Sequence, residues 1–342
     1  MTEEHLALGG RALGGGQPCL VVARVAGAHE GSAEAALRMI EAAFRMGADA
    51  IAFQVFRAAE LVVRRHPERR DLERIELRAS EWRRILEAAK ASGLGVVAEV
   101  LDMPSREVAA EAGVDAFQLQ ASDLDHPDLV RALAGTGRPL FLCAGEAPEA
   151  LVSEAIVLAG DGGALLLGPS AAPALIEEVR LRELAVRKQR YRVPVGFLDA
   201  IDGGSAFALV APALAAAHGA DFVEKGFTLD RSRKGRDYAS ALSPEDFYRM
   251  VELLRQAERA RGDAGAEGRE APPRPEGEAG RLIVAKALIP RGEALTAEML
   301  AFKRTNERRG RGLAPREAHR IIGRRTARPI QADETIREDM LE

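Results

Sequence analysis

Cysteine is scarce in this chain. Only Cys19 and Cys143 occur among its 342 residues. Two thiols cannot build a disulfide scaffold or a zinc site made of thiolates, so we expect a protein of a reducing compartment, the cytoplasm. The opening segment, residues 1–16, holds two glutamates and several glycines in place of a basic segment and an apolar one. It therefore does not predict a secretory signal.

Aromatic residues, long apolar runs and excess positive charge are lacking as well. Aromatic residues make up 4% of the chain and there is one Trp, which argues against base-stacking platforms and aromatic sugar cradles. No apolar run reaches the roughly 18 residues that a transmembrane helix needs. A net charge of −4 excludes a generally basic, nucleic-acid-coating protein. We expect neither a nucleic-acid nor a membrane partner.

The composition that remains is that of a globular protein, with 47% hydrophobic and 29% charged residues. One segment, 261–280 (RGDAGAEGREAPPRPEGEAG), is rich in Gly, Pro, Ala and charge and has no aliphatic side chain larger than Ala. Such a segment cannot bury apolar surface and is typical of an exposed linker. The sequence thus predicts a large domain over 1–260, a flexible linker over 261–280 and a small domain over 281–342.

Short aliphatic runs alternate with amphipathic stretches throughout the first domain. The runs are 19–25, 50–56, 95–101, 116–121, 139–144, 164–168, 193–197 and 221–225. The helical patterns begin near Ser32, Ser80, Pro104, His126, Pro148, Pro173, Gly204 and Ser243. Near-continuous apolar runs indicate parallel strands buried on both faces, so we predict an α/β fold, a (β/α)8 TIM barrel. A doubly wound open sheet is the alternative, but no Gly-rich loop follows the first strand.

The small domain has a different pattern. A strand-like run, RLIVAKALI (281–289), precedes a turn at 290–292 and one-turn helices near 297–300 and 315–322. Small strands mixed with one-turn helices predict a compact β-rich module.

Polar side chains follow most of the predicted strands, where barrels of this kind carry their chemistry. Asp199, Glu224 and Asp237 offer oxygen ligands for a divalent metal, but we favour the alternative that such acids cap helices and pair with basic residues. The Gly-Gly-Ser turn at 203–205 is either an anion site made of backbone amides or a tight turn. Cys143 is better explained as a packed side chain than as a nucleophile, because no base is recognisable near it.

Several stretches resemble the sialic acid synthase (N-acetylneuraminate synthase) family, from about residue 18 to the end of the chain. VARVAGAHEGS resembles the family's AEIGxNHxG turn, and GADAIAFQVFRAAELV its GADAVKFQTFKAEDLV. PVGFLDAIDGG resembles PVGYSDHTxG, and the FTLD and ALSPEDF block (227–247) is also similar. The tail resembles the antifreeze-like SAF domain. The resemblance implies a barrel followed by a SAF domain, and condensation of phosphoenolpyruvate with an N-acylated amino sugar at a divalent metal.

Position by position, the resemblance also implies a degenerate active site. The family's two metal-binding histidines correspond to Ala200 and Gly226, neither of which has a lone pair for a metal. The early catalytic glutamate corresponds to Arg24, a reversal of charge. A lysine corresponds to Gln118, and a hydroxyl-bearing motif now carries Glu99. These replacements remove most of the charge that would hold a phosphate and a carboxylate.

Other positions still match the family. Glu224 and Asp237 correspond to residues that touch the amino sugar in the family, and Arg304 or Arg308 in the basic loop 304–312 corresponds to the SAF arginine that reaches the partner subunit's sugar. The candidate ligand-binding residues are His29, Gln54, Glu99, Asp199, Glu224, Lys225, Asp237, Arg304 and Arg308. We predict no catalytic residue and no cofactor, and expect the family's manganese or magnesium ion to be absent.

The function that we expect from this sequence is that of a family member without the condensation activity. It would bind a sugar or an anionic small molecule, or serve as a partner subunit. The alternative is a diverged enzyme of carbohydrate biosynthesis acting on a different anionic or sugar substrate, with Arg24 suited to a new anion. The family arrangement implies a homodimer with each SAF domain over the other subunit's barrel, or a heterodimer with an active synthase.

Overall fold

The computed structural model describes residues 6–169, 171–233, 235, 237–262, 280–305 and 312–342. The chain divides into two compact units, Met1–Gly262 and Asp263–Glu342. Most of the expected linker 261–280 lies outside the described residues. Each unit is described below by itself.

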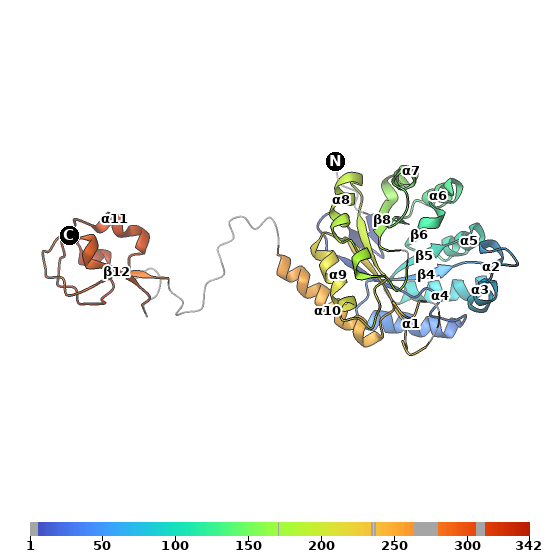
Figure 1. The fold of residues 1–342 in the computed structure, drawn as a ribbon, viewed down its shortest axis with the longest axis horizontal. Helices are drawn as coiled ribbons and strands as arrows, with labels where there is room; N and C mark the ends of the chain where they lie inside the picture. The colour runs from blue at the N-terminus through green and yellow to red at the C-terminus, as the bar shows by residue number, and fades with distance from the viewer. Residues whose placement is uncertain (1–5, 170, 234, 236, 263–279, 306–311) are drawn as a thin grey trace. The chain divides into compact units, whose positions relative to one another are not determined.

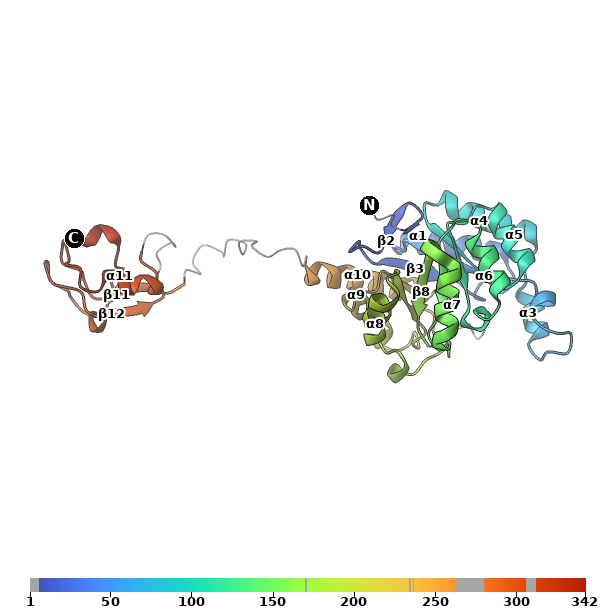
Figure 2. The same cartoon turned by 90° about the horizontal axis from the view of Figure 1, so that it is seen from above.

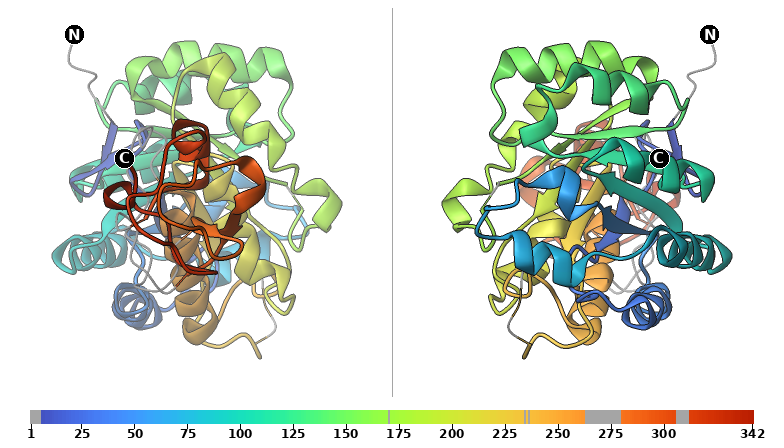
Figure 3. Two further views of the ribbon diagram at one scale, coloured as in Figure 1. Left: turned by 90° about the vertical axis from the view of Figure 1, so that its left-hand side faces the viewer. Right: turned by 90° about the vertical axis from the view of Figure 1, so that its right-hand side faces the viewer.

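Eight parallel strands of the first unit close into a barrel, in the order β10-β3-β4-β5-β6-β7-β8-β9 (Figures 1 and 3). They are β3 (Leu20–Arg24), β4 (Ala50–Val55), β5 (Gly95–Val100), β6 (Ala116–Leu119), β7 (Leu140–Cys143), β8 (Gly163–Leu167), β9 (Val195–Asp199) and β10 (Phe222–Gly226). The predicted (β/α)8 barrel is confirmed, and the open sheet is excluded because β10 pairs with both β9 and β3.

Helices surround the strands, as the right-hand view of Figure 3 shows. The main ones are α1 (Ala33–Arg45), α4 (Ala79–Ala91), α5 (Met103–Glu111), α6 (Pro127–Ala134), α7 (Glu149–Ala159), α8 (Arg182–Tyr191), α9 (Phe207–Ala217) and α10 (Pro244–Arg261). Their first turns obey local rules: Ser32 Oγ accepts from the Ala35 N–H at 3.2 Å, and Ser243 caps α10 with proline at the next position.

One helix start differs from the sequence prediction. The helix expected near Pro173 begins only at Arg182, after the single turn η3 (Ile176–Glu178). The Ala174 N–H donates to the Ala200 carbonyl at 2.9 Å, and Ala174 forms an isolated parallel bridge with Ile201, just beyond β9. A tertiary hydrogen bond thus overrides the local helical pattern.

Two further parts of the fold are not indicated by any strong pattern in the local sequence. Between β4 and α4 the chain forms two short helices, α2 (Ala58–Leu61) and α3 (Arg69–Ile75). Before the barrel, β1 (Leu6–Leu8) and β2 (Arg11–Leu13) form an antiparallel hairpin. Smaller 3-10 turns are η1 (Ala121–Asp123) and η2 (Gly160–Gly162).

The hairpin covers the N-terminal end of the barrel. Leu8 and Leu13 are buried in one cluster with the inward-facing Leu20, Phe141 and Phe222. The hairpin's tight turn is glycine for a steric reason, since a Cβ on Gly9 would lie 2.6 Å from the Gly95 Cα. This end of the barrel is therefore a packed core.

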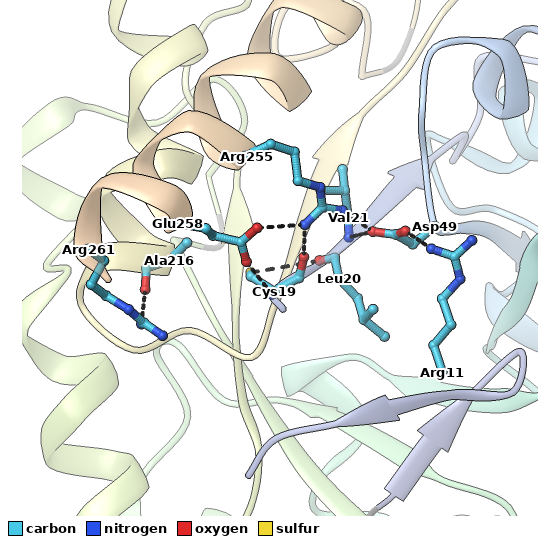
Figure 4. A network of polar contacts seen from close by, with 9 residues as sticks. All are labelled: Arg11, Cys19, Leu20, Val21, Asp49, Ala216, Arg255, Glu258 and Arg261. Atoms are coloured by element: carbon cyan, nitrogen blue, oxygen red, sulfur yellow. Dashed lines mark hydrogen bonds and ion pairs between the residues drawn. The ribbon is translucent and has the colours of Figure 1, made fainter. Parts of the chain in front are cut away.

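Charged side chains at the same end tie the last helix to the first strand (Figure 4). Asp49 accepts the Val21 N–H at 2.9 Å and also contacts the guanidinium groups of Arg11 and Arg255. Arg255 donates to the Cys19 carbonyl at 2.7 Å and to Glu258 at 3.0 Å. This network links α10, β3 and the hairpin at the N-terminal end of the barrel.

The second unit has a small core of its own. Strands β11 (Leu282–Ala285) and β12 (Leu300–Lys303) pair antiparallel (Figure 2), and the only α-helix among its described residues is α11 (Ala318–Ile321). The remaining turns are η4 (Ala297–Met299), η5 (Pro315–Glu317) and η6 (Glu338–Met340). Ile283, Leu295, Ile330, Ile336 and Met340 fill the interior. The β-rich module predicted from the sequence is confirmed.

A search of the described residues for membrane-spanning helices finds none, since no helix there combines enough length with enough apolar character.

Candidate functional site

A cavity of about 710 Å³ opens at the C-terminal ends of the barrel strands. Its polar floor and wall include Arg24, Gln54, Glu99, Gln118, Cys143, Asp199 and Asp237. Its apolar wall includes Phe56, Leu61, Val62, Leu72 and Ile75, from β4 through α3. A concave site with a mostly apolar wall and a few convergent polar groups is the usual form of a small-molecule site.

Arg24 lines the cavity and forms two ion pairs there. It is the last residue of β3, and its Nη2 lies 3.0 Å from Glu99 Oε2, while its Nε lies 3.1 Å from Glu224 Oε1. The side chains of Glu99 and Glu224 are 3% and 0% exposed. Burial opposes the charge of Arg24, but the two carboxylates outweigh it and raise the pKa of the guanidinium. The three groups form one ion cluster, in which two buried acids hold a base that is 19% exposed.

Glu224 is the titratable member of this cluster near neutral pH. Burial raises the pKa of its carboxyl to about 7, against the lowering effect of Arg24. Gln118 Nε2 donates to Glu224 Oε1 at 3.2 Å and contacts Cys143 Sγ at 3.7 Å. The second oxygen of Glu224 and Gln118 Oε1 have no hydrogen-bond partner.

Cys143 lines the cavity but is poorly suited to be a nucleophile. Burial raises the pKa of its thiol well above the usual value, with Glu99 and Glu224 adding to the effect. The thiolate is therefore disfavoured, which supports the interpretation of Cys143 as a packed side chain.

Asp199 and Lys225 form a second buried pair on neighbouring strands. Lys225 Nζ lies 3.1 Å from Asp199 Oδ1 and donates to the Ile201 carbonyl at 2.9 Å. Asp199 Oδ1 also accepts the Ile201 N–H at 2.8 Å, whereas Asp199 Oδ2 has no partner. Burial raises the pKa of Asp199 and lowers the pKa of Lys225. Asp199 lines the cavity, and Lys225 lies behind it.

The two positions that the family resemblance assigns to metal ligands both line the cavity. The Ala200 side chain is a methyl group and Gly226 has only a hydrogen atom, so neither side chain brings a donor atom for a metal. A Cβ on Gly226 would lie 3.0 Å from the Ala241 Cα, so the backbone of the following loop occupies the space that a larger side chain would need. Within the described part of the chain, no three His, Cys, Asp or Glu side chains group as a metal site. The residues present do not fit the family's ion.

The turn at 203–205 does not offer free amides to an anion. The Gly203 N–H donates to the Ala239 carbonyl at 2.8 Å, and the Gly204 N–H donates to Asp202 Oδ1 at 2.7 Å. Both donors are used within the chain, which favours the tight-turn alternative.

The structure brings together most of the residues predicted from the sequence, but not all. Gln54, Glu99, Asp199 and Asp237 line the cavity, and Glu224 lies directly behind Arg24. His29 does not line it. Its ring is fully buried against Trp82 at 5.5 Å, and burial lowers its pKa to about 4. Its Nδ1 accepts the Gly31 N–H at 3.1 Å.

The two arginines of the basic loop belong to the second unit. Arg304 is exposed on that unit, just beyond β12. Arg308 lies outside the described residues.

Some cavity residues were missed by the sequence analysis. Leu61, Val62, His66, Glu68 and Leu72 come from the segment that contains α2 and α3. The signal was the long interval between the strand ending near 56 and the helix beginning near 80, which is more chain than a short connection needs.

Comparisons with known proteins agree with this architecture. Residues 39–266 match the NeuB family, and residues 280–342 match the SAF domain. An uncharacterized protein of Methanocaldococcus jannaschii is 30% identical over 99% of each chain. The N-acetylneuraminate-9-phosphate synthase of Homo sapiens is 26% identical, covering 97% of this chain and 95% of its own.

Solved structures lead to the same family. The N-acetylneuraminic acid synthetase of Leptospira borgpetersenii, solved in complex with citrate, superposes with a TM-score of 0.72 at 25% identity and covers 77% of this chain and 92% of its own. The spore coat polysaccharide biosynthesis protein SpsE of Bacillus subtilis shares the fold at 24% identity, with a TM-score of 0.67 and 99% coverage of both chains. The resemblance seen in the sequence is thereby confirmed, and this chain belongs to the NeuB family, as a (β/α)8 barrel followed by a SAF domain.

Proposed function

We propose that this chain binds a small molecule in the barrel cavity without the metal-dependent condensation of phosphoenolpyruvate that the resemblance to sialic acid synthases implies. The observation that carries the proposal is the ion cluster of Arg24 with Glu99 and Glu224, at 3.0 and 3.1 Å. A guanidinium whose charge is compensated by two carboxylates therefore lies where the resemblance expects a catalytic acid. The two carboxylates compensate the charge of this arginine, so its attraction for a phosphate group is weak.

The metal positions support the same proposal. An ion that polarises an aldehyde contributes several kcal/mol to the stabilisation of developing charge. Ala200 and Gly226 have no donor atoms in their side chains, and Asp199 already pairs with Lys225. This donor set does not suit Mn²⁺ or Mg²⁺, so we expect no such cofactor.

The test is consumption of phosphoenolpyruvate by the purified full chain with N-acetylmannosamine, in the presence and absence of Mn²⁺ and Mg²⁺. An active family synthase assayed in parallel serves as the positive control. We expect no metal-dependent consumption above the rate without protein. Turnover that EDTA abolishes would falsify the proposal.

A second candidate function rests on Glu224. A buried carboxyl with a pKa of about 7 suits proton transfer near neutral pH, so the cavity is also compatible with a diverged enzyme of carbohydrate biosynthesis that acts on another substrate. If a screen of sugars and anionic metabolites finds a turnover, Glu224→Gln should abolish it. Retention of that turnover by Glu224→Gln would exclude this candidate.

For quaternary structure, we propose a dimer, either of this chain or with an active synthase, in which the SAF domain reaches a partner's barrel. The family match of residues 280–342 and the exposed Arg304 support this proposal. Light scattering of the full chain should give the mass of a dimer, either when it is purified alone or after it is mixed with an active synthase. A monomer that also fails to bind an active synthase would contradict it.

A further inference from the structure

We propose that the ligand of the barrel cavity is an uncharged amphipathic small molecule, with a hydroxyl-bearing part and an alkyl or aryl part. The inference deepens the proposed function and rests on it. It follows from two accessible amides, those of Gln54 and Gln120, that lie in one cavity with an accessible aliphatic wall.

The charged groups of the cavity floor are paired within the chain. Arg24 is held by Glu99 and Glu224, and Asp237, which also lines the cavity, adds to the stabilisation of the guanidinium charge. Asp199 pairs with Lys225 at 3.1 Å. The buried polar atoms of this floor that lack a hydrogen-bond partner have almost no accessible surface; they are Arg24 Nε, Gln118 Oε1, Asp199 Oδ2 and Glu224 Oε2. A ligand therefore meets other groups.

Two uncharged side chains of the floor are accessible. Ala52 and Ala116 belong to the cluster inside the barrel, so the alternation of side chains along a strand directs Gln54 and Gln120 inward as well. Both glutamines line the cavity and are half-buried, and neither side-chain amide has a hydrogen-bond partner within the described part of the chain. A primary amide offers donors and an acceptor without net charge, so it matches hydroxyl groups, which also donate and accept.

The apolar wall of the cavity is accessible too. Leu61 at the end of α2 and Val62 just after it are half-buried and line the cavity. They pack on Phe56 and Leu72, which line the cavity as well. Contact between aliphatic side chains and water is unfavourable, so a ligand gains affinity for each methylene group that it buries against this wall.

Aliphatic side chains also form one side of the floor. Leu166 on β8 and Leu198 on β9 pack with the cluster inside the barrel and line the cavity, as does Ala200 just beyond β9. A charged group placed against them would lose hydration without gaining a partner. The cavity, of about 710 Å³, therefore has room for a hydroxyl-bearing part near Gln54 and Gln120 and for an apolar part elsewhere.

Two series of probes vary the apolar part of the ligand. One is methyl, butyl and hexyl β-D-glucopyranoside, and the other is glycerol with its 1-O-butyl and 1-O-hexyl ethers. Isothermal titration calorimetry on the full chain, below micelle-forming concentrations, should show the hexyl member of at least one series binding about tenfold or more tightly than its shortest member. Absence of this gain in both series up to about 10 mM would overturn the inference.

A second comparison varies the charge at a constant apolar part. The hexyl compound of the series that shows the gain is compared with its ionic counterparts, which are hexyl β-D-glucuronide and hexyl β-D-glucosaminide, or the 3-phosphate and the 3-amine of hexylglycerol. At about pH 6.5 the uncharged compound should bind more tightly than both. Equal or tighter binding of either ionic counterpart would contradict the inference.

Variants connect the binding to the cavity. Val62→Asn should weaken the hexyl compound about threefold or more, whereas Val63→Asn, at a residue that is 74% exposed and does not line the cavity, should leave it unchanged. Leu61→Asn provides a second test if Val62→Asn does not fold. Gln54→Leu, which removes an amide without changing charge, should weaken the hexyl compound about threefold or more as well. Binding that none of the cavity variants weakens would place the ligand elsewhere and refute the inference.

The two proposals fail in different assays. Metal-dependent consumption of phosphoenolpyruvate contradicts the proposed function whatever these probes do. Absence of a gain with alkyl length, with no consumption of phosphoenolpyruvate, contradicts only the present inference.

Discussion

Arg24 Nε lies 3.1 Å from Glu224 Oε1, between the ends of two adjacent barrel strands, and the Glu224 side chain is fully buried. The same guanidinium reaches Glu99 on its other side at 3.0 Å. An arginine that is held between two acids has a fixed orientation, and each acid depends on it for compensation in a medium of low dielectric constant. The chemistry and the stability of the cavity floor are therefore linked.

Removal of Arg24 should destabilise the barrel. Arg24→Met leaves Glu99 and Glu224 facing each other without a cation, and breaking a buried ion pair in this way typically costs about 3–5 kcal/mol. Urea denaturation at about pH 8 measures the loss. Arg83→Met, which breaks the exposed pair with Glu111, is the control and should have little effect. Equal stabilities of the two variants would show that the cluster is not a structural unit.

Glu224 should make stability depend on pH. Burial raises its pKa from 4.5 to about 7, so the folded protein retains a proton that the unfolded chain releases. This contribution is fully present below pH 4.5 and is lost as the pH rises through about 7. Glu224→Gln, which resembles the protonated form, should become more stable relative to the wild type between about pH 5 and 8.

The measurement is the free energy of unfolding of both proteins across that range. Glu154→Gln on α7 is the matched control, and its stability should stay parallel to that of the wild type. A constant difference between Glu224→Gln and wild type would mean that the carboxyl titrates normally.

The Asp199–Lys225 pair predicts a second large effect. Lys225→Met would leave the Asp199 carboxylate buried without its cation and the Ile201 carbonyl without its donor, which should cost about 3–5 kcal/mol. Lys303→Met, at the exposed pair with Asp333, is a control that should change little. If the double variant Asp199→Asn, Lys225→Met is no more stable than Lys225→Met, the uncompensated charge is not the cause.

Gly226 should not accept a side chain without strain. A Cβ there would lie 3.0 Å from the Ala241 Cα and 3.3 Å from its amide nitrogen, so Gly226→Ala should destabilise the protein by about 1–3 kcal/mol. Gly162→Ala is the matched control, because a Cβ at that site meets only the Arg138 carbonyl oxygen, at 3.4 Å. Thermal unfolding compares the two variants. Full stability of Gly226→Ala would show that a larger residue fits at this metal position after all.

The order of elements was largely predictable from the sequence. Most barrel strands are largely apolar runs buried on both faces, and helix starts such as Ser243-Pro244 obey local rules of capping. The start expected near Pro173 was wrong because the Ala174 N–H pairs with Ala200, a contact between segments far apart in the sequence. The hairpin Leu6–Leu13 is stabilised by its burial against the barrel end, for which short strands give no local sign.

The sequence predicted which residues belong to the site but not which of them pair with one another. The sequence alone determined that acids, an arginine and a cysteine follow the strands, and that Ala200 and Gly226 bring no donor atoms to a metal. Only the tertiary structure decided that Arg24 is shared by Glu99 and Glu224, that His29 is buried against Trp82, and that Gln118 and Asp199 keep unpartnered oxygens at the cavity. The physical reason is that residue type fixes which charges and donors exist, whereas pairing and burial depend on distances between strands that only the closed barrel sets.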